Sequence, residues 1–150
     1  MRIYRQETIF RLASDATLLA WDTYAAGRVA RGERFAFGRL CGLTRIFRDG
    51  KPEATDGFDL VGAVEHFGGY SYVAGVHVLA PEDLGPVAEE LHHSLAGVSG
   101  ALASASAPAP GHCVVRVLAH RAPELYGALN GVRSIARERL GLPAPARPVV

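Results

Sequence analysis

The stretch YSYVAGVHVL, residues 70–79, separates two parts of the sequence that differ in character. It is rich in β-branched and aromatic residues, which predicts a strand. Directly after it, apolar residues recur at the spacing of one helix face: Leu84, Val87, Ala88, Leu91 and Leu95. This spacing predicts a helix that buries one side.

A second strand and a second helix are predicted further along the chain. Residues 112–119 (HCVVRVLA) have strand character, and Pro123 suits the first turn of a helix. The apolar side of that helix carries Leu125, Leu129, Val132, Ala136 and Leu140. Between the first predicted helix and the second predicted strand, the uncharged run 94–111 is mostly Ala, Ser, Gly and Pro, so we expect a flexible loop. Residues 143–150 are proline-rich, and we expect a frayed tail.

The part before residue 70 predicts strands. The first ten residues, MRIYRQETIF, alternate between polar and apolar, and residues 17–24 and 34–47 are rich in strand-favouring side chains. Asp49-Gly50 predicts a hairpin, because a type I′ turn needs positive φ at both central positions, and Asp56-Gly57 predicts a second turn. The sequence therefore predicts a β-rich α+β fold, mostly antiparallel, with two helices in its C-terminal half and a single domain over residues 1–150.

Composition narrows the class of protein. The chain has 150 residues, 49% hydrophobic and 21% charged, as a folded domain does. Its net charge of +1 gives no electrostatic reason to expect binding to nucleic acid or to an acidic membrane. We find no apolar stretch of about 18 residues and no secretory signal at the N-terminus, so we expect a soluble, cytoplasmic protein. Cys41 and Cys113 are expected to be reduced core thiols.

Candidate catalytic and metal-binding groups are sparse. His92 and His93 are adjacent on the first predicted helix, so their side chains point about 100° apart and cannot easily chelate one metal. His93 could do so with Glu89 or Glu90, although a solvated polar face explains these residues as well. His112 and His120 lie on the order of 26 Å apart along a strand and cannot share a metal there.

The sequence also lacks the patterns of common active sites. It has neither a GxSxG nucleophile elbow nor a phosphate-binding glycine loop. We therefore predict no catalytic residue and no cofactor-binding residue.

The segment GRVARGERF, residues 27–35, stands out between two predicted strands. Two glycines five residues apart indicate unusual φ values or a close approach of the backbone. Arg28 and Glu33 could pair across the turn. Alternatively, Glu33 could face a polar channel or a partner, and the sequence leaves both interpretations open.

This segment carries a resemblance to a known family. LLAWD at residues 18–22, then Gly27-Arg28, then GERF at residues 32–35 resemble the "LLWWE…GR…GE.F" stretch of the urease accessory protein UreD (UreH) family. The residues that match the family motif are Gly27, Arg28, Gly32, Glu33 and Phe35. The strand and helix that follow residue 112 are also similar to the C-terminal part of that family. The family is longer and has an N-terminal β portion, with a "PPGG…GGD" segment, that this sequence lacks.

The resemblance implies an elongated β structure and a chaperone that helps nickel reach the active site of apo-urease, in complex with UreF and UreG. No cofactor would be bound tightly. An ion that is passed onward cannot be held in a complete cage, so Glu33 and Asp22 would at most contact nickel weakly and transiently. On the second predicted helix, Tyr126, Arg133 and Arg137 would be available to UreF. A separate chain could supply the missing N-terminal portion.

Two other interpretations remain. The first is a stand-alone β-rich protein-binding module with no nickel role. The second, and the weaker, is a small metal-dependent hydrolase that uses His92, His93 or His112 with a carboxylate.

Overall fold

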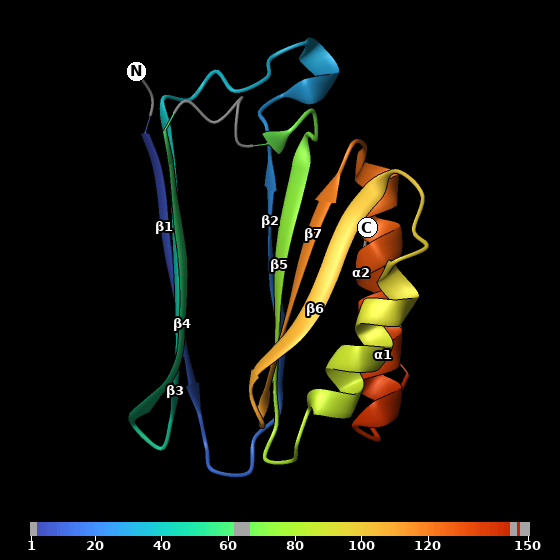
Figure 1. Cartoon of the computed structure of the whole chain (residues 1–150). Coiled ribbons are helices and arrows are strands. Elements are labelled where there is room, and N and C mark those ends of the chain that lie inside the picture. Colours follow the sequence, from blue (N-terminus) through green and yellow to red (C-terminus); the bar gives the residue numbers. More distant parts are fainter. Residues whose placement is uncertain (1–2, 62–66, 145–146, 148–150) are drawn as a thin grey trace. The chain divides into compact units, whose positions relative to one another are not determined.

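The structure is a computed structural model that describes residues 3–61, 67–144 and 147. The chain forms two compact units (Figure 1). The first unit contains Met1–Ala16 and Ala25–Gly69, and the second contains Thr17–Tyr24 and Tyr70–Val150. The single domain over residues 1–150 stays a prediction. Most of the tail predicted to be frayed, 143–150, lies outside the described residues.

A three-stranded sheet forms the first unit, with strand order β1-β3-β4. Its elements are β1 (Ile3–Leu12), the short 3₁₀ helix η1 (Val29–Arg31), β3 (Arg39–Arg48) and β4 (Lys51–Val61). The pair β3–β4 is antiparallel, whereas β1–β3 is parallel. The strand predicted over residues 34–47 begins only at Arg39, because residues 34–38 belong to a loop.

The two predicted turns have different outcomes. Asp49 and Gly50 have φ values of 48° and 73° and join β3 to β4, so the predicted hairpin is confirmed. The prediction of a turn at Asp56-Gly57 is wrong, because both residues lie inside β4. There Asp56 pairs with Thr44 and Gly57 with Leu43, so pairing with β3 outweighs the local turn preference of this dipeptide.

A four-stranded sheet and two helices form the second unit, with strand order β2-β5-β7-β6. Its elements are β2 (Leu18–Ala25), β5 (Tyr72–Leu79), α1 (Gly85–Leu95), β6 (Ala101–Ala109), β7 (His112–Ala119) and α2 (Ala122–Arg139). Strand β7 is antiparallel to both β5 and β6. Both helices lie on one face of this sheet (Figure 1). The predicted β-rich, mostly antiparallel α+β fold with two helices is confirmed.

The core of the second unit lies between the helices and the sheet. Both predicted helices are confirmed, and their predicted apolar faces are buried at Val87, Ala88, Leu91, Leu95, Leu125, Leu129, Val132 and Ala136. The sheet contributes Ala74, Val76, Val78, Cys113, Val115, Val117 and Ala119 to the same core. The structure shows no helix among its described residues that is long and apolar enough to cross a membrane.

The prediction of a flexible loop over residues 94–111 is wrong, because β6 occupies half of this range. Ala101, Ala103 and Ala105 pack against the core, while Ser104 and Ser106 are exposed. This alternation of faces is that of a half-buried strand, and β7 supplies the pairing. Alanine and serine carry little strand preference of their own, so the pairing partner decides the structure.

The two cysteines differ in environment. Cys113 is fully buried, and burial raises the pKa of its thiol to about 11. Cys41 is only partly buried, and its Sγ donates to Oδ1 of Asp59 at 3.2 Å. The expectation of a core thiol is therefore right for Cys113 and wrong for Cys41, which lies on a sheet face lined with charged side chains.

Candidate functional site

The segment that matches the family motif forms a compact loop before β3. The backbone N–H of Val29 donates to the carbonyl of Gly27 at 2.9 Å, and that of Gly32 donates to Val29 at 3.0 Å. A further N–H, that of Glu33, reaches the carbonyl of Arg28 at 3.3 Å. These short-range bonds satisfy the backbone of the turn and fix where the Arg28 and Glu33 side chains begin.

The two motif glycines serve different purposes in this loop. Gly27 has a φ of +129°, and a Cβ at this position would lie 2.8 Å from the carbonyl oxygen of Glu33. Gly32 has a φ of +72° and ends η1, but a Cβ there would meet open space. Gly27 is thus required by both conformation and close approach, and Gly32 by conformation alone.

Arg28 and Glu33 form a two-pronged ion pair. The guanidinium Nε and Nη2 donate to the two carboxylate oxygens at 2.8 and 2.7 Å. Their side chains are 59% and 42% exposed, so solvent screens the pair. The pairing across the turn that the sequence left open is present. Whether Glu33 also contacts a metal or a partner stays a prediction.

Phe35 anchors the end of the loop. It has a φ of 54°, unusual for a residue other than glycine, and its N–H donates to the carbonyl of Ala26 at 2.5 Å. Its ring lies 5.0 Å from that of Phe67, which is buried, and 6.1 Å from that of Phe37. The guanidinium of Arg34 lies 5.6 Å from the ring centroid of Phe35. The aromatic contacts hold this backbone in a conformation that it would otherwise rarely adopt.

Asp22, the other predicted nickel contact, lies in the second unit on β2. Its neighbour Trp21 packs against the helix-covered core, so Asp22 projects from the opposite face of the sheet. Glu33 belongs to the first unit, where its carboxylate is bound by Arg28. In the part of the chain that the structure describes, no three His, Cys, Asp or Glu side chains are grouped to hold a metal.

The predicted partner-binding residues lie on one side of α2. Tyr126, Arg133 and Arg137 are seven and four residues apart, which brings them to the same helix face, and each is partly exposed. Tyr126 also packs against the core, and Nε of Arg137 donates to the carbonyl of Pro143 at 2.6 Å. These two residues are therefore held in place, and their contact with a partner stays a prediction.

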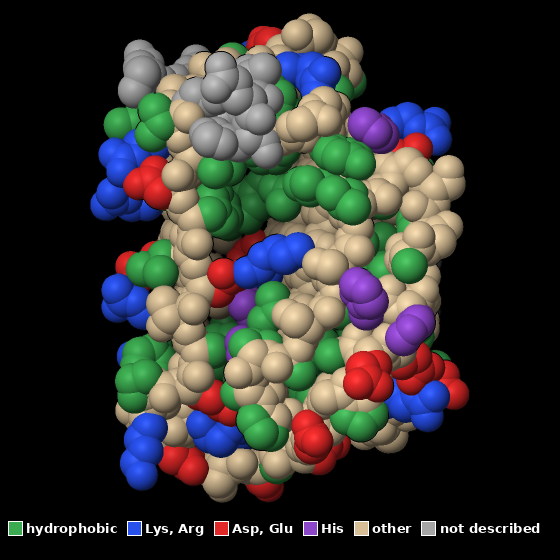
Figure 2. Space-filling model, in the orientation of Figure 1, with side chains coloured by type: hydrophobic (Ala, Val, Ile, Leu, Met, Phe, Trp, Pro, Cys, Tyr) green, Lys and Arg blue, Asp and Glu red, His purple; other side chains and the backbone are tan. Residues whose placement is uncertain are grey.

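His93 and Glu90 on α1 each contact another partner in this structure. Nδ1 of His93 is 2.8 Å from the backbone carbonyl of Glu89. Glu90 is bound instead by Arg139, and that hydrogen bond lowers the pKa of the Glu90 carboxyl. Figure 2 shows histidine, acidic and basic side chains gathered on the surface over α1. The solvated polar face is the arrangement present here.

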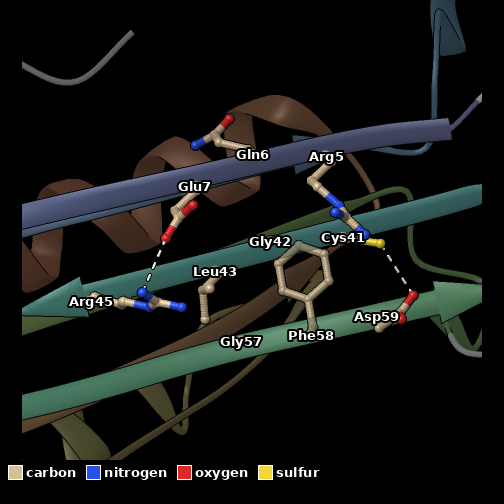
Figure 3. Close-up of a pocket in the computed structure, with 10 residues that line it drawn as sticks. All are labelled: Arg5, Gln6, Glu7, Cys41, Gly42, Leu43, Arg45, Gly57, Phe58 and Asp59. Atoms are coloured by element: carbon tan, nitrogen blue, oxygen red, sulfur yellow. Dashed lines mark hydrogen bonds and ion pairs between the residues drawn. The ribbon is translucent and has the colours of Figure 1, made fainter.

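Sequence reasoning missed a hollow of about 550 Å³ on the charged face of the first sheet (Figure 3). Oδ1 of Asp59 accepts from Nε of Arg39 at 2.7 Å and from Sγ of Cys41 at 3.2 Å. Nη1 of Arg45 lies 3.5 Å from Oε1 of Glu7. The hydrogen bonds from Arg39 and Cys41 lower the pKa of the Asp59 carboxyl to about 2. Arg5 and Glu7 at alternate positions of β1, with Arg39 and Arg45 on β3, were the signal that could have indicated this face.

Ion pairs with arginine affect the acidic side chains that line this hollow. Glu7 and Asp59 are each engaged by an arginine. An acid whose pKa is held near 2 stays ionised at neutral pH and has no proton to give. Asp59 therefore cannot act as a general acid at neutral pH.

Comparison with known proteins identifies the family. A sequence model of the UreD urease accessory protein family matches residues 3–150. "Urease accessory protein UreD" of Sorangium cellulosum is 30% identical over 154 residues, covering 92% of this chain and 46% of the relative. "Urease accessory protein UreD 2" of Streptomyces griseus is 35% identical over 153 residues, covering 95% and 52%.

A UreD protein of Haloarcula marismortui gives a similar match, 30% identical over 152 residues, with 95% of this chain and 50% of the relative covered. The chain thus spans about half the length of the curated relatives that it matches. The resemblance carried by the loop from Gly27 to Phe35 is confirmed over nearly the whole chain. The chain therefore belongs to the UreD family of urease accessory proteins.

Proposed function

We propose that this chain acts in urease maturation, as a chaperone that helps to insert nickel into apo-urease in complex with UreF and UreG. The observation that carries the proposal is the family match over residues 3–150, which includes the motif loop. The chain serves this role without chemistry of its own and without a tightly bound cofactor. It works in the cytoplasm.

The state of Glu33 supports a transient contact with nickel. Its carboxylate is 42% exposed and is already held by the guanidinium of Arg28. The guanidinium occupies two of the lone pairs of this carboxylate, and its positive charge repels a divalent ion, so the contact is weak and easily reversed. Asp22, which is partly exposed on β2 in the second unit, is a separate candidate contact with its own carboxylate. Oxygen ligands of this kind suit an ion that is handed on, because nickel binds a few carboxylates less tightly than a set of thiolates and imidazoles.

The exposed side of α2 is the surface we assign to UreF. The apolar side of α2 is buried in the core of the second unit. Tyr126, Arg133 and Arg137 lie outside that buried face and are partly exposed. Tyrosine and arginine are enriched at the centres of protein interfaces, where they bury large areas and form directed hydrogen bonds.

Co-purification tests this assignment. The tagged chain, produced together with UreF from the same organism at low salt, should retain UreF, and nickel should change the yield little. Arg133→Glu should reduce the retained UreF at least several-fold. Glu138→Lys, also a charge reversal on α2 but at an exposed position away from that side, is the matched control and should retain it. Absence of UreF from the wild-type preparation, with both proteins folded, would contradict the proposal.

A further inference from the structure

Strand β6 lies at one edge of the four-stranded sheet in the second unit. It pairs with β7 on one side, and no described segment of the chain pairs with its other side. An open edge presents unpaired backbone N–H and C=O groups, on which a strand of another chain can add. Folded proteins usually prevent this with charged side chains, Pro or a bulge on the edge.

Two hydrogen bonds show how the backbone of β6 is oriented. The carbonyl of Ala119 on β7 accepts from the N–H of Ser71 at 3.0 Å, so the backbone groups of Ala119 point toward β5. Ala119 is paired with Ala101 on β6, and this pair therefore exchanges no hydrogen bonds. The pair beside it is bonded, because the N–H of His120 donates to the carbonyl of Gly100 at 3.2 Å. The N–H and C=O of Ala101 thus point away from β7, to the free edge.

The same orientation recurs at every second residue of β6. Bonded and non-bonded pairs alternate along an antiparallel ladder, so Ala103 and Ala105 also turn their N–H and C=O groups to the free edge. The register stays regular as far as Ser106, and it shifts only between Ser106 and Ala109. The free edge thus presents a donor and an acceptor at each of three alanines, repeating at about 6.6 Å, as the pairing of an added strand requires.

This edge lacks the usual protection. Residues 94–111 contain no charged side chain, and Pro108 and the register shift lie beyond the regular part of the strand. The other edge strands that the structure describes, β1, β2 and β4, each carry charged residues. Among the described edges, β6 is therefore the one most open to strand addition.

Helix α1 packs over β6 and leaves room beside it (Figure 1). A hollow of about 340 Å³ lies between the two elements. It is lined in part by Ala88, Glu89 and His92 of α1 and by Ala105 and Ala107 of β6. These residues all belong to the second unit, so this unit alone forms the hollow. Because its alanines are small, the hollow has room for side chains of a strand added at the edge.

A second copy of this chain does not fit at the edge. Antiparallel pairing of two β6 strands would place them about 4.8 Å apart, with both α1 helices on the same face of the joined sheet. Packed helices need about 8–10 Å between their axes, so two helices that lie over adjacent strands would collide. An extended segment without a covering helix meets no such obstacle.

We propose that the free edge of β6 binds an extended segment of another protein, which adds to the sheet as a further strand. Backbone hydrogen bonds to Ala101, Ala103 and Ala105 supply the affinity, and the hollow beside α1 selects uncharged side chains on one face of the segment. This site uses elements other than α2 and goes beyond the proposed role in urease maturation. The experiment uses the purified chain alone, so its failure and the failure of the proposed function are distinguishable.

Amide hydrogen exchange of the wild-type chain, measured residue by residue by NMR, is the test. The probe is a short synthetic peptide of alternating valine and threonine, methylated on every second backbone nitrogen so that one edge can pair and the peptide cannot form sheets with itself. In the free protein, the amides of Ala101, Ala103 and Ala105 should exchange faster than those of Leu102 and Ser104, which are bonded to β7. Saturating probe should slow the three alanine amides at least tenfold.

The same peptide methylated on every backbone nitrogen is the control and should have no effect. Unchanged exchange of the three alanine amides with the probe, or equal slowing by both peptides, would overturn the assignment. Slowing that grows with protein concentration in the absence of peptide would identify a second copy as the occupant and would overturn it as well.

Proline substitutions test the edge from the side of the protein. Ala103→Pro removes an N–H that points to the free edge, where Pro is tolerated, so the variant should fold and bind the probe at least tenfold more weakly. Ser104→Pro removes an N–H that is bonded to β7 and should be the less stable of the two variants. Probe binding by Ala103→Pro equal to that of the wild type, or the reverse order of stability, would overturn the proposal.

Discussion

Replacing Gly27 with alanine should destabilise the motif loop more than the same replacement at Gly32. Both glycines have positive φ, but only at Gly27 would the new Cβ lie 2.8 Å from a backbone oxygen, that of Glu33. Cβ atoms do not approach that closely, so the loop backbone itself must move. At Gly32 the φ of +72° lies in the left-handed region, and the Cβ meets open space.

The magnitudes follow from these two geometries. Left-handed backbone costs a residue with a Cβ about 1–2 kcal/mol, which is the whole expected effect of Gly32→Ala. Gly27→Ala adds the steric contact to a φ that is still less favourable, for a total on the order of 3 kcal/mol. Moving the Glu33 carbonyl also disturbs the neighbouring Arg28–Glu33 pair, which adds little because that pair is exposed.

Urea unfolding followed by far-ultraviolet circular dichroism measures both changes in the free energy of unfolding. Gly27→Ala should lower it by at least about 1 kcal/mol more than Gly32→Ala does. An effect of Gly27→Ala equal to or smaller than that of Gly32→Ala would refute the close-approach argument. So would a loss of less than about 0.5 kcal/mol in both variants, which is the range of ordinary surface substitutions.

Three further predictions concern Glu33, Cys113 and catalysis. Glu33→Gln should change the free energy of unfolding by no more than about 1 kcal/mol, because the ion pair that it removes is exposed. It should nevertheless lower urease activation in cells, because a neutral amide cannot replace an anionic ligand. Normal activation by the folded variant would limit Glu33 to pairing with Arg28. Burial raises the pKa of the Cys113 thiol to about 11, so as the pH rises the unfolded state loses the thiol proton before the folded state does. Between pH 9 and 11 the wild type should therefore lose stability relative to Cys113→Ala, on the order of 2 kcal/mol. Parallel profiles of stability against pH for the two proteins would contradict this. Purified protein should not hydrolyse generic ester, phosphate or amide substrates, and turnover that is lost on changing a single His or Cys would disprove that expectation.

Local patterns in the sequence predicted the features that depend on local structure. The helical spacing from Leu84 to Leu95 identified α1, because one buried face is enough to define a helix. The Arg28–Glu33 pair and the Asp49-Gly50 hairpin were also within reach, since the partners are at most five residues apart in the chain. In these cases the contacts that decide the structure lie within one element or one turn.

Features that depend on distant partners were missed. Strand β6 is built from alanine and serine, and only its pairing with β7 makes it a strand. The parallel pairing of β1 with β3 likewise joins segments that neither local composition nor turn chemistry connects. His112 was compared only with His120 in its own strand, whereas its contact is His77, 35 residues away on the neighbouring strand. Long-range strand register decides each of these, and a single sequence does not reveal it.

The nickel content of urease tests the proposed function most directly. Urease would be isolated from cells of the organism that makes this chain, with its gene intact, deleted or restored on a plasmid, and nickel per urease active site would be measured by mass spectrometry alongside urease activity. We predict that deletion lowers nickel content and activity together, by at least tenfold, and that the restored gene returns both. Urease that is fully loaded with nickel and fully active in the deletion strain would contradict a role for this chain in nickel insertion.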